Sequence, residues 1–507
     1  MAEHQGKVYL VGAGPGDPQL ITLKGKRCLE EADVVLYDRL ASESLLTLTQ
    51  NGAELIYVGK SADRHALSQE EINQVLIDKA LEGKIVVRLK GGDPYIFGRG
   101  GEEALQLAEA KIPFEVIPGV TSSSAVPAYA GIPVTHRGLA SSVAFITGHE
   151  DPTKETSTIN WEKLSMGVDT LVFLMGVGNL PLIVDQLQAY GRPPETPVAV
   201  IQWGTTPSQR TVIGTLANIV ERVQSAKLGP PAITVVGSVV KFHDQLNWFE
   251  KKPLLGQTIV VTRSREQASE FAELLQEYGA RVIEFPTIET VPVDNWDEVD
   301  RAIEKLESYL WAIFTSASAV KGFLARLKQR GRDLRALKGI KLCAIGAKTA
   351  AELEKFGISV DLIPSEYRAE GVIEAMGKEK IDGANILFPR AEVARELLPD
   401  TLRHMGATVD IVAVYRTIKP TQKAENLLAM LREGEIDLIT FTSSSTVINF
   451  VEIFKGQDLQ HLLRGVKIGT IGSITANTAE QFGLKADIIP QESTIEAFLK
   501  SIVASLA

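Results

Sequence analysis

The sequence is poor in the side chains that build disulfide and metal sites. Only two of its 507 residues are cysteines, Cys28 and Cys343, and they lie far apart in apolar or helical stretches. Two such cysteines provide neither a disulfide framework nor a zinc site, so we expect both to be buried packing residues. His136 and His149 have no histidine four residues away and no Cys-X-X-Cys motif beside them. No metal site is therefore predicted.

Long apolar runs and basic blocks are also missing. No stretch approaches 18 uninterrupted apolar residues, which argues against a membrane span. The first residues, MAEHQGKVYLVGAG, enter a strand directly, without the basic and long apolar regions of a signal peptide. We therefore expect a cytoplasmic location. The formal net charge of −10, without a Lys/Arg block, argues against nucleic-acid binding, although local arginines can still bind a small anionic substrate.

What the sequence does contain is a regular alternation of β-branched runs and amphipathic helical stretches. VYLVGAG, LKGKRCLEEA, DVVLYD and KIVVRLKGG are examples. This alternation predicts an α/β fold with largely parallel sheets. A chain of 507 residues exceeds one hydrophobic core, so three or four compact units of about 100 to 150 residues are expected. Residues 243–257, with Pro253 and Gly256, break the alternation and predict the main boundary near residue 250.

Beyond this boundary the sequence repeats itself. AIFTSASAVKGF resembles LITFTSSSTVINF, and KLCAIGAKTAAELEKFGISVDLIP resembles KIGTIGSITANTAEQFGLKADIIP. Equivalent positions are offset by 126 or 127 residues, too far for a solenoid, which indicates two α/β domains from one duplication. The Ser and Thr residues at the strand ends either line a cleft between these domains or merely cap helices, and both interpretations are open.

Glycine-rich turns follow two strands of the first half. VGAGPGD, residues 11–17, does not fit a dinucleotide fingerprint, because Asp17 and Pro18 stand where the third glycine and the helix start are needed. LKGGDPYIFGRGGEE, residues 89–103, contains five glycines, more than a tight turn requires. Such glycines let a ligand approach the backbone, and Asp93 can accept hydrogen bonds from an amine or a ribose.

The motifs of the first half resemble a known family. VGAGPGDPQLIT, YDRL, VGK, LKGGDPYIFGRGGEE, PGVTSSSAVPAYAGIPVTHR, LMG and PAITVVGSVV are similar, in order and spacing, to the uroporphyrinogen-III C-methyltransferases of the tetrapyrrole (class III) methyltransferase fold. The resemblance implies two α/β subdomains, S-adenosylmethionine in the crevice between them, and a homodimer. It assigns residues 1–245 to a methyltransferase, followed by a linker at 246–257.

Matching positions then imply the roles of single residues. The cofactor-binding residues would be Pro15, Gly91, Gly92, Asp93, Ile96, Thr121, Ser122, Met175, Gly204 and Ala232. Asp38 and Lys60 would form the acid/base pair, although without the resemblance they are read as a helix cap and a solvated lysine.

The substrate of this family carries carboxylates, which favour two-pronged arginine donors. The substrate-binding residues would be Arg99 and Arg137, with Glu102 for the pyrrole NH groups. Arg88 is either a further carboxylate-binding residue or an exposed residue at a strand end.

The second half resembles uroporphyrinogen-III synthase. The resemblance covers residues 256–505 and is carried by the TR of VVTR, FTSASAV, FPRAE, VYRT and FTSSSTV. It implies a synthase over residues 258–507 with two α/β domains, one from 256–289 with 418–507 and the other from 291–415. It also implies that ring closure requires no cofactor.

Tyr415 in VYRT matches the family's recurrent tyrosine, which helps a hydroxyl group to leave. A tyrosine at a strand end is otherwise a packing residue with its hydroxyl in water. The implied substrate-binding residues are Arg263, Thr315, Ser316, Arg390, Thr442, Ser443 and Thr475.

Together the two resemblances predict a bifunctional enzyme of tetrapyrrole synthesis. It would cyclise hydroxymethylbilane to uroporphyrinogen III with inversion of ring D, and would then methylate that product twice to precorrin-2, toward sirohaem or cobalamin. The alternative is a methyltransferase for another corrinoid or a macromolecule, fused to a non-catalytic tetrapyrrole-binding module.

Overall fold

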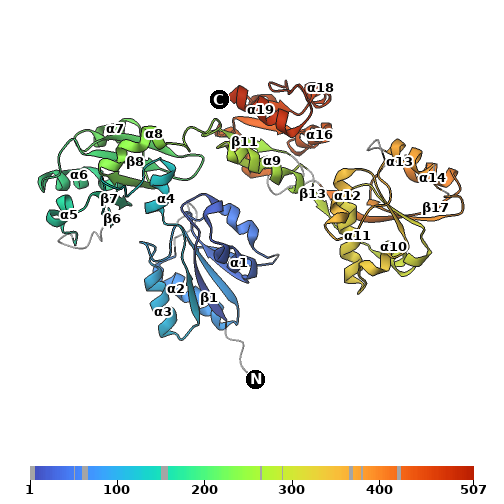
Figure 1. The fold of residues 1–507 in the computed structure, drawn as a ribbon, viewed down its shortest axis with the longest axis horizontal. Helices are drawn as coiled ribbons and strands as arrows, with labels where there is room; N and C mark the ends of the chain where they lie inside the picture. The colour runs from blue at the N-terminus through green and yellow to red at the C-terminus, as the bar shows by residue number, and fades with distance from the viewer. Residues whose placement is uncertain are drawn as a thin grey trace. The chain divides into compact units, whose positions relative to one another are not determined.

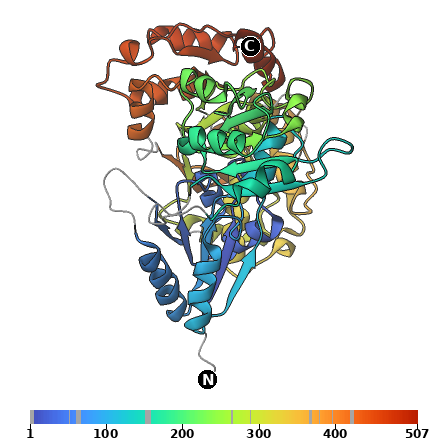
Figure 2. The ribbon, with the colours of Figure 1, turned by 90° about the vertical axis from the view of Figure 1, so that its left-hand side faces the viewer.

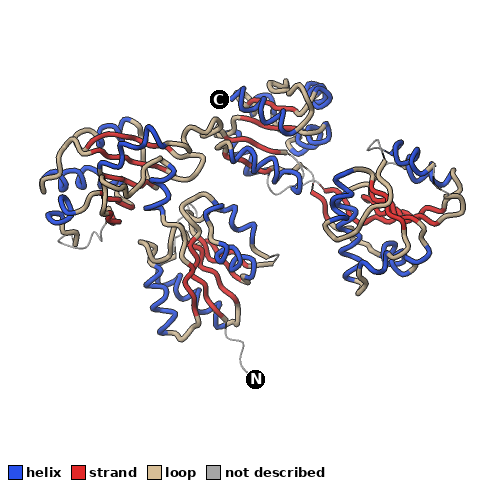
Figure 3. The backbone as a smooth tube through the Cα atoms, viewed as in Figure 1, coloured by secondary structure: helices blue, strands red, loops and turns tan. Residues whose placement is uncertain are grey.

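The computed structural model describes residues 6–50, 52–59, 67–149, 158–262, 265–287, 289–364, 369–377, 379, 381–394, 396–418 and 424–506. Within these residues four β-sheets lie among helices (Figure 3). The chain divides into two compact units, one of residues 1–257 with 275–281 and 506–507, the other of residues 258–274 with 282–505. The predicted α/β architecture is confirmed.

The first sheet consists of five parallel strands in the order β3-β2-β4-β1-β5. Its central strands are largely apolar on both faces because helices cover both, and the charged Arg88 and Lys90 of β4 are exceptions. Val8 and Leu10 of β1 pack with α2 and α3, whereas Val11 packs with α1 on the other face (Figures 1 and 2). The elements are β1 (Lys7–Gly12), α1 (Leu23–Glu31), β2 (Val34–Tyr37), β3 (Glu54–Tyr57), α2 (Gln69–Leu81), β4 (Ile85–Lys90), α3 (Gly100–Glu109), β5 (Phe114–Ile117) and α4 (Ser122–Tyr129).

The second sheet has the order β6-β7-β10-β8-β9 and is mixed. β6 and β7 are parallel, and the other neighbours are antiparallel. The elements are β6 (Val143–Thr147), α5 (Trp161–Gly167), β7 (Thr170–Leu174), α6 (Leu180–Ala189), β8 (Pro197–Gln202), β9 (Arg210–Thr215), α7 (Ile219–Ser225), β10 (Ala232–Val236) and α8 (His243–Leu246).

The segment expected as a linker packs on the first unit. Phe249 and Leu254 are buried. The carboxylate of Glu250 accepts hydrogen bonds from Gln209 Nε2 at 2.8 Å and from the hydroxyl of Thr211. This segment therefore has fixed contacts with the fold that precedes it.

The third sheet has the order β12-β11-β18-β19 and combines strands from both ends of the second unit. β11, β18 and β19 are mutually parallel. The elements are β11 (Thr258–Val261), α9 (Arg265–Glu277), β12 (Arg281–Glu284), α15 (Ala424–Arg432), β18 (Leu438–Phe441), α16 (Ser444–Ile453), α17 (Leu459–Leu462), β19 (Lys467–Thr470), α18 (Ser473–Gln481) and α19 (Ile495–Leu506).

The fourth sheet has the order β13-β17-β16-β14-β15, with only β13 antiparallel to its neighbour. The elements are β13 (Glu289–Val291), α10 (Asp297–Glu304), β14 (Trp311–Phe314), α11 (Ala317–Gln329), β15 (Lys341–Ala344), α12 (Ala347–Glu354), α13 (Ala369–Met376), β16 (Asn385–Ala391), α14 (Leu397–His404) and β17 (Thr408–Ile418). Short 3-10 helices are η1 (Pro18–Leu20), η2 (Glu43–Leu48), η3 (Val177–Asn179), η4 (Ser238–Phe242), η5 (Leu306–Ser308) and η6 (Leu334–Leu337).

The duplicated sequence segments form the same local structure. Asp361 accepts a hydrogen bond from the amide of Leu342 at 2.7 Å, and Asp487 accepts the equivalent bond from Ile468 at 2.8 Å. Both aspartates fix the loop that returns beside a parallel strand. The repeat in the amino-acid sequence is therefore also a repeat of this hydrogen bond in the structure.

Cys28 and Cys343 are both buried and unbridged, as predicted. Burial raises the pKa of Cys343 to about 12, because the apolar surroundings disfavour the thiolate. Among the described residues, no helix has both the length and the apolar character needed to cross a bilayer.

Candidate functional sites

Glycine turns meet at the carboxyl ends of β1, β4 and β5. The Gly14 amide lies 3.2 Å from Gly92 O, and the Gly92 amide lies 2.7 Å from Gly14 O. A Cβ atom at Gly12 would lie 2.5 Å from Gly119 Cα, and one at Gly119 would lie 2.3 Å from Gly92 O. These glycines are needed because backbone packs directly on backbone here.

Gly92 also leaves a small space before α4. Its φ is +68°, and a Cβ there would fill the space, 3.7 Å from the Ser122 amide and 4.0 Å from Thr121 Cα. Thr121 is the N-cap of α4 and Ser122 its first residue. A bare glycine facing the amide end of a helix is suited to a carboxylate or a ribose hydroxyl. Three of the predicted cofactor residues are thus brought together.

Asp93 holds the glycine turns in place. One carboxylate oxygen accepts the Tyr95 amide at 2.8 Å, and the other accepts the Gly119 amide at 3.0 Å. This role in fixing the loop was not predicted. Each carboxylate oxygen has a second lone pair, so these bonds leave acceptor capacity for a ligand.

The turn of residues 14–17 contacts the loop after β8. The Asp17 amide donates to the hydroxyl of Thr205 at 3.1 Å, and a Cβ at Gly16 would lie 3.3 Å from Gly204 O. Pro15 therefore sits in a turn that touches the loop of Gly204. A Cβ at Gly204 would lie 2.3 Å from Val126 Cγ1, so glycine is required where this loop packs on α4.

The same loop adjoins Ala232. The amide of Trp203 donates to Pro231 O at 3.1 Å, directly before Ala232 at the buried start of β10. The Arg39 guanidinium lies over the Trp203 ring, 5.8 Å from its centroid. Neither Trp203 nor Arg39 was predicted as a site residue.

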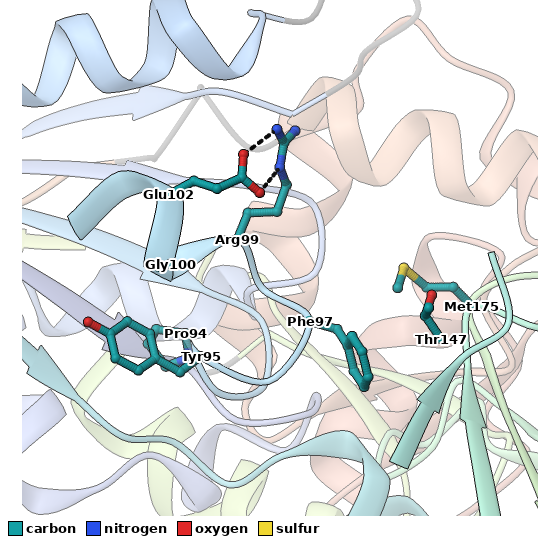
Figure 4. A pocket seen from close by; sticks show the side chains of 9 residues that line it. Pro94, Tyr95, Phe97, Arg99, Gly100, Glu102, Thr147 and Met175 are labelled. Carbon is teal, nitrogen blue, oxygen red and sulfur yellow. Dashed lines mark hydrogen bonds and ion pairs between the residues drawn. The ribbon is translucent and has the colours of Figure 1, made fainter. Parts of the chain in front are cut away.

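A pocket of about 540 Å³ lies between the loop after β4 and the ends of β6 and β7 (Figure 4). It combines the predicted Arg99, Glu102 and Met175. Figure 4 shows the ring of Phe97 on the side of Met175, whereas the ring of Tyr95 points the other way. The lining residues are Pro94, Tyr95, Phe97, Arg99, Gly100, Gly101, Glu102, Thr147 and Met175.

Arg99 and Glu102 form a two-pronged ion pair at the pocket. Arg99 Nε lies 3.0 Å from Glu102 Oε1 and Nη2 lies 2.6 Å from Oε2. This pairing raises the pKa of Arg99 and lowers that of Glu102. Both side chains are exposed, so an incoming carboxylate can compete for the guanidinium.

Backbone strain is found at this pocket and in the loop after β8. Seven non-glycine residues in the described part of the chain have positive φ, and five of them are Phe97, Arg99, Met175, Trp203 and Thr205. Left-handed backbone costs free energy for such residues and is retained mainly at functional sites. The sequence signal that could have identified Phe97 is the presence of aromatic residues in the YIFG stretch of a glycine-rich loop.

Asp38 follows β2 and is tied to a buried arginine. Its Oδ1 accepts the Leu40 amide at 3.0 Å and its Oδ2 accepts Arg88 Nη2 at 3.1 Å. Arg88 is 4% exposed, so its interpretation as an exposed strand-end residue is wrong. Its guanidinium donates to Asp38, Glu103 and Leu89 O, and a role in binding a substrate carboxylate stays a prediction. Lys60, the predicted partner of Asp38, lies outside the described residues.

Two predicted residues of the first half, Ile96 and Arg137, do not line this pocket. Ile96 is partly exposed in the loop between Asp93 and the pocket. Arg137 is exposed at the tip of the turn in which His136 and Ala140 pair, and it does not line the pocket.

In the second unit, Tyr415 of β17 meets the start of α11. Its hydroxyl lies 3.1 Å from the Ser316 hydroxyl, which also accepts the Ala319 amide at 3.1 Å as the helix N-cap. Thr315 directly precedes Ser316 after β14. Ser316 therefore caps α11 and also contacts Tyr415, while its role in binding substrate stays a prediction, and the ring of Tyr415 packs on the core.

The remaining predicted synthase residues lie at other strand ends. Ser443 caps α16, after Thr442 and β18, and Thr475 is buried in α18. Arg390, at the end of β16, is buried and paired with Glu396. That pairing lowers the pKa of Glu396. Arg263 lies outside the described residues.

Comparisons with known proteins divide the chain in the same way. Residues 7–220 match the family model of tetrapyrrole (corrin/porphyrin) methylases, and residues 269–500 match that of uroporphyrinogen-III synthase HemD. A porphyrin biosynthesis protein HemD from Ruminiclostridium josui is 37% identical over 99% of this chain and 98% of its own length.

Two further relatives match the first half. An S-adenosyl-L-methionine-dependent uroporphyrinogen III methyltransferase from Methanosarcina barkeri is 56% identical over 48% of this chain and 96% of its own length. A solved structure of uroporphyrin-III C-methyl transferase from Thermus thermophilus, complexed with S-adenyl homocysteine, is 44% identical and covers 46% of this chain and 99% of its own, with a TM-score of 0.41.

Proposed function

This chain belongs to the tetrapyrrole methylases through its first half and to the uroporphyrinogen-III synthases through its second, and we propose that it carries out both reactions. The second half cyclises hydroxymethylbilane to uroporphyrinogen III with inversion of ring D. The first half transfers two methyl groups from S-adenosylmethionine to that macrocycle, giving precorrin-2 for sirohaem or cobalamin synthesis.

One observation carries the methyltransferase proposal. The pocket joins a guanidinium, Arg99, with a soft thioether, Met175, next to a turn whose glycines open toward a helix N-terminus. The guanidinium is suited to a macrocycle that carries carboxylates. The thioether and the glycine turn are suited to a cofactor with a sulfonium, an amino acid portion and a ribose.

The residues present fit S-adenosylmethionine. Gly92 with Thr121 and Ser122 would receive its polar end, and the loop of Gly204 with Ala232 would receive its adenine. When bound, S-adenosylmethionine supplies an electrophilic methyl group that an electron-rich pyrrole carbon attacks, with the C–S electron pair left on sulfur. This chemistry requires alignment rather than a metal.

The protein's own groups align the macrocycle and accept its proton. Arg99 binds a substrate carboxylate when it exchanges its bonds with Glu102, which then faces the pyrrole NH groups. Phe97 and Met175 provide apolar surface in the pocket for the macrocycle. Asp38, with Lys60, accepts the proton that leaves the macrocycle after methylation.

Tyr415 serves the ring closure of the second half. When Ser316 is the donor in the hydrogen bond that joins the two hydroxyls, the Tyr415 proton is left to be given to the hydroxyl group that leaves the bilane. The strand-end residues Thr315, Thr442 and Ser443, with Arg390, bind the substrate's carboxylates through hydroxyls, amides and a guanidinium.

The two reactions are tested separately. Uroporphyrinogen III and S-adenosylmethionine are supplied to the purified chain, and we expect two equivalents of S-adenosylhomocysteine per macrocycle. Hydroxymethylbilane is supplied alone, and we expect the type III isomer. Exclusive formation of uroporphyrinogen I, the product of spontaneous closure, would contradict the synthase assignment. We further propose a cytoplasmic location and a homodimer joined through the methyltransferase half. Light scattering of the purified chain tests the dimer, and light scattering of residues 1–257 alone tests whether this half forms it.

A further inference from the structure

A cluster of four charged side chains, three of them buried, lies between the first sheet and α3. Glu103 of α3 is fully buried, and Arg88 and Lys90 of β4 are each 4% exposed. Glu103 Oε1 accepts Lys90 Nζ at 2.7 Å and Arg88 Nε at 3.3 Å. Asp38, the fourth member, is the only one whose side chain reaches the surface appreciably, with 27% exposed.

Arg88 joins the two carboxylates of this cluster, because its guanidinium donates both to the buried Glu103 and to Asp38. Arg88 presents Nε to Glu103, Nη1 to Leu89 O at 3.1 Å and Nη2 to Asp38 Oδ2 at 3.1 Å. A guanidinium is planar, so fixing two of its nitrogens fixes the direction of the third. The orientation of the Asp38 carboxylate is therefore set by Glu103 through Arg88.

The loop of Asp38 itself provides little restraint. Within the described residues, Asp38 Oδ1 accepts one hydrogen bond, from the nearby Leu40 amide. This bond does not fix the plane of the carboxylate, which then depends on Arg88, the partner of Oδ2. A Cβ at Gly91 would lie 2.7 Å from Leu40 Cβ, so the Asp38 turn packs against the predicted cofactor loop. A rotation of Asp38 would displace its free lone pair relative to that loop.

Stability does not explain the cluster. Moving charged groups into an apolar interior costs several kcal/mol per ion, and apolar side chains of similar volume stabilise such positions equally or better. Glu103 Oε2 has no hydrogen-bond partner among the described residues, which adds to that cost. Burial also lowers the pKa of Lys90, with repulsion by Arg88 as the next cause.

We propose that Arg88 and Glu103 are positioning residues for Asp38: Glu103 orients the Arg88 guanidinium, and Arg88 holds the Asp38 carboxylate in the direction from which it receives the substrate's proton. The proposal rests on the methyltransferase function proposed above. Lys90 supplies the second positive charge on Glu103, so two cations and two carboxylates balance.

A double-mutant cycle on the full chain tests this. Arg88→Met, Asp38→Asn and the double variant are assayed with uroporphyrinogen III and S-adenosylmethionine, and calorimetric titration with S-adenosylhomocysteine counts the folded sites. We expect Arg88→Met to lower kcat at least about tenfold with an unchanged KM for S-adenosylmethionine. In the Asp38→Asn background, the same change should cost less than about twofold.

Arg192→Met is the matched control. Arg192 is also buried, but it donates to the backbone carbonyls of Ser165, Val168 and Asp169 in the second sheet's subdomain. Its loss should reduce thermal stability and leave kcat per folded site unchanged. Arg88→Lys, which keeps a charge near Asp38, should recover part of the rate lost in Arg88→Met.

Equal losses for Arg88→Met with and without Asp38 would overturn the proposal, as would an unchanged kcat. If titration finds no folded Arg88→Met, the cycle is run with Glu103→Gln, which keeps the side-chain shape, and the same criteria decide. Failure of the unmodified chain to transfer methyl groups would instead refute the proposed function, and is seen before any variant is made.

Discussion

The hydroxyl of Tyr415 lies 3.1 Å from that of Ser316, joining β17 to the first turn of α11. A strand residue and a helix cap 99 positions apart thus share one hydrogen bond. The bond restrains both hydroxyls, and it offers a direct test of the synthase half.

Tyr415→Phe removes this hydroxyl and keeps the ring. We expect ring closure to slow by about tenfold or more, because a positioned proton donor is lost, while methylation of supplied uroporphyrinogen III is unchanged. Tyr309→Phe is the control, since the Tyr309 hydroxyl bonds Asp410 in the same sheet without contact to Ser316. If the Tyr309 variant loses as much ring-closing activity per folded molecule as the Tyr415 variant, the specific role of Tyr415 is refuted.

Asp38→Ala and Lys60→Ala should separate the two activities. Methyl transfer should fall by about a hundredfold in each, because a positioned acid or base contributes that order of rate. Ring closure should remain at the level of the unmodified chain, which is measured on the same preparation with hydroxymethylbilane. Parallel loss of both activities would show that these variants damage the fold rather than the site.

Gly119→Ala should disrupt the glycine turns. The added Cβ would lie 2.3 Å from Gly92 O, so backbone must move, at a cost on the order of 1–3 kcal/mol in the free energy of unfolding. We expect affinity for S-adenosylhomocysteine to fall more than about tenfold, as the space before α4 closes. Gly167→Ala, at the end of α5, meets nothing within 4 Å and should lower neither the denaturant midpoint nor the affinity.

Glu115 makes stability depend on acidic pH. Hydrogen bonds from Lys24 and Lys7 lower the pKa of this exposed carboxyl from 4.5 to about 2. A depressed carboxyl pKa stabilises the folded state above pH 4.5 and loses that contribution as pH falls toward 2. Glu115→Gln should therefore flatten the fall in urea midpoint over this range, more clearly at low salt. Glu30→Gln, whose ion pair with Lys26 spans 3.8 Å, should leave the profile unchanged.

The sequence predicted the layers and the duplication because these follow from local patterns, and the family resemblance predicted three of the residues that line the pocket, Arg99, Glu102 and Met175. Apolar runs specify strands buried on both faces, and the glycine-rich motif contains Arg99 and Glu102 within four residues. The burial of Cys28 and Cys343 followed from their apolar neighbours.

Local sequence patterns could not predict hydrogen bonds between residues that lie far apart in the sequence. Arg88 occupies a strand position, but its partners Asp38 and Glu103 lie 50 and 15 residues away. Only the pairing of β2 with β4 and the packing of α3 bring them together, so its burial was missed. Trp203 was missed for the same reason, since its contact with Arg39 joins two subdomains.

The most direct test of the account is the mass of the tetrapyrrole that the purified chain forms from hydroxymethylbilane. With S-adenosylmethionine present, we predict a macrocycle heavier by two methyl groups, and without it the unmethylated type III macrocycle. A product of unchanged mass in the presence of the methyl donor would contradict the claim that one chain performs both steps.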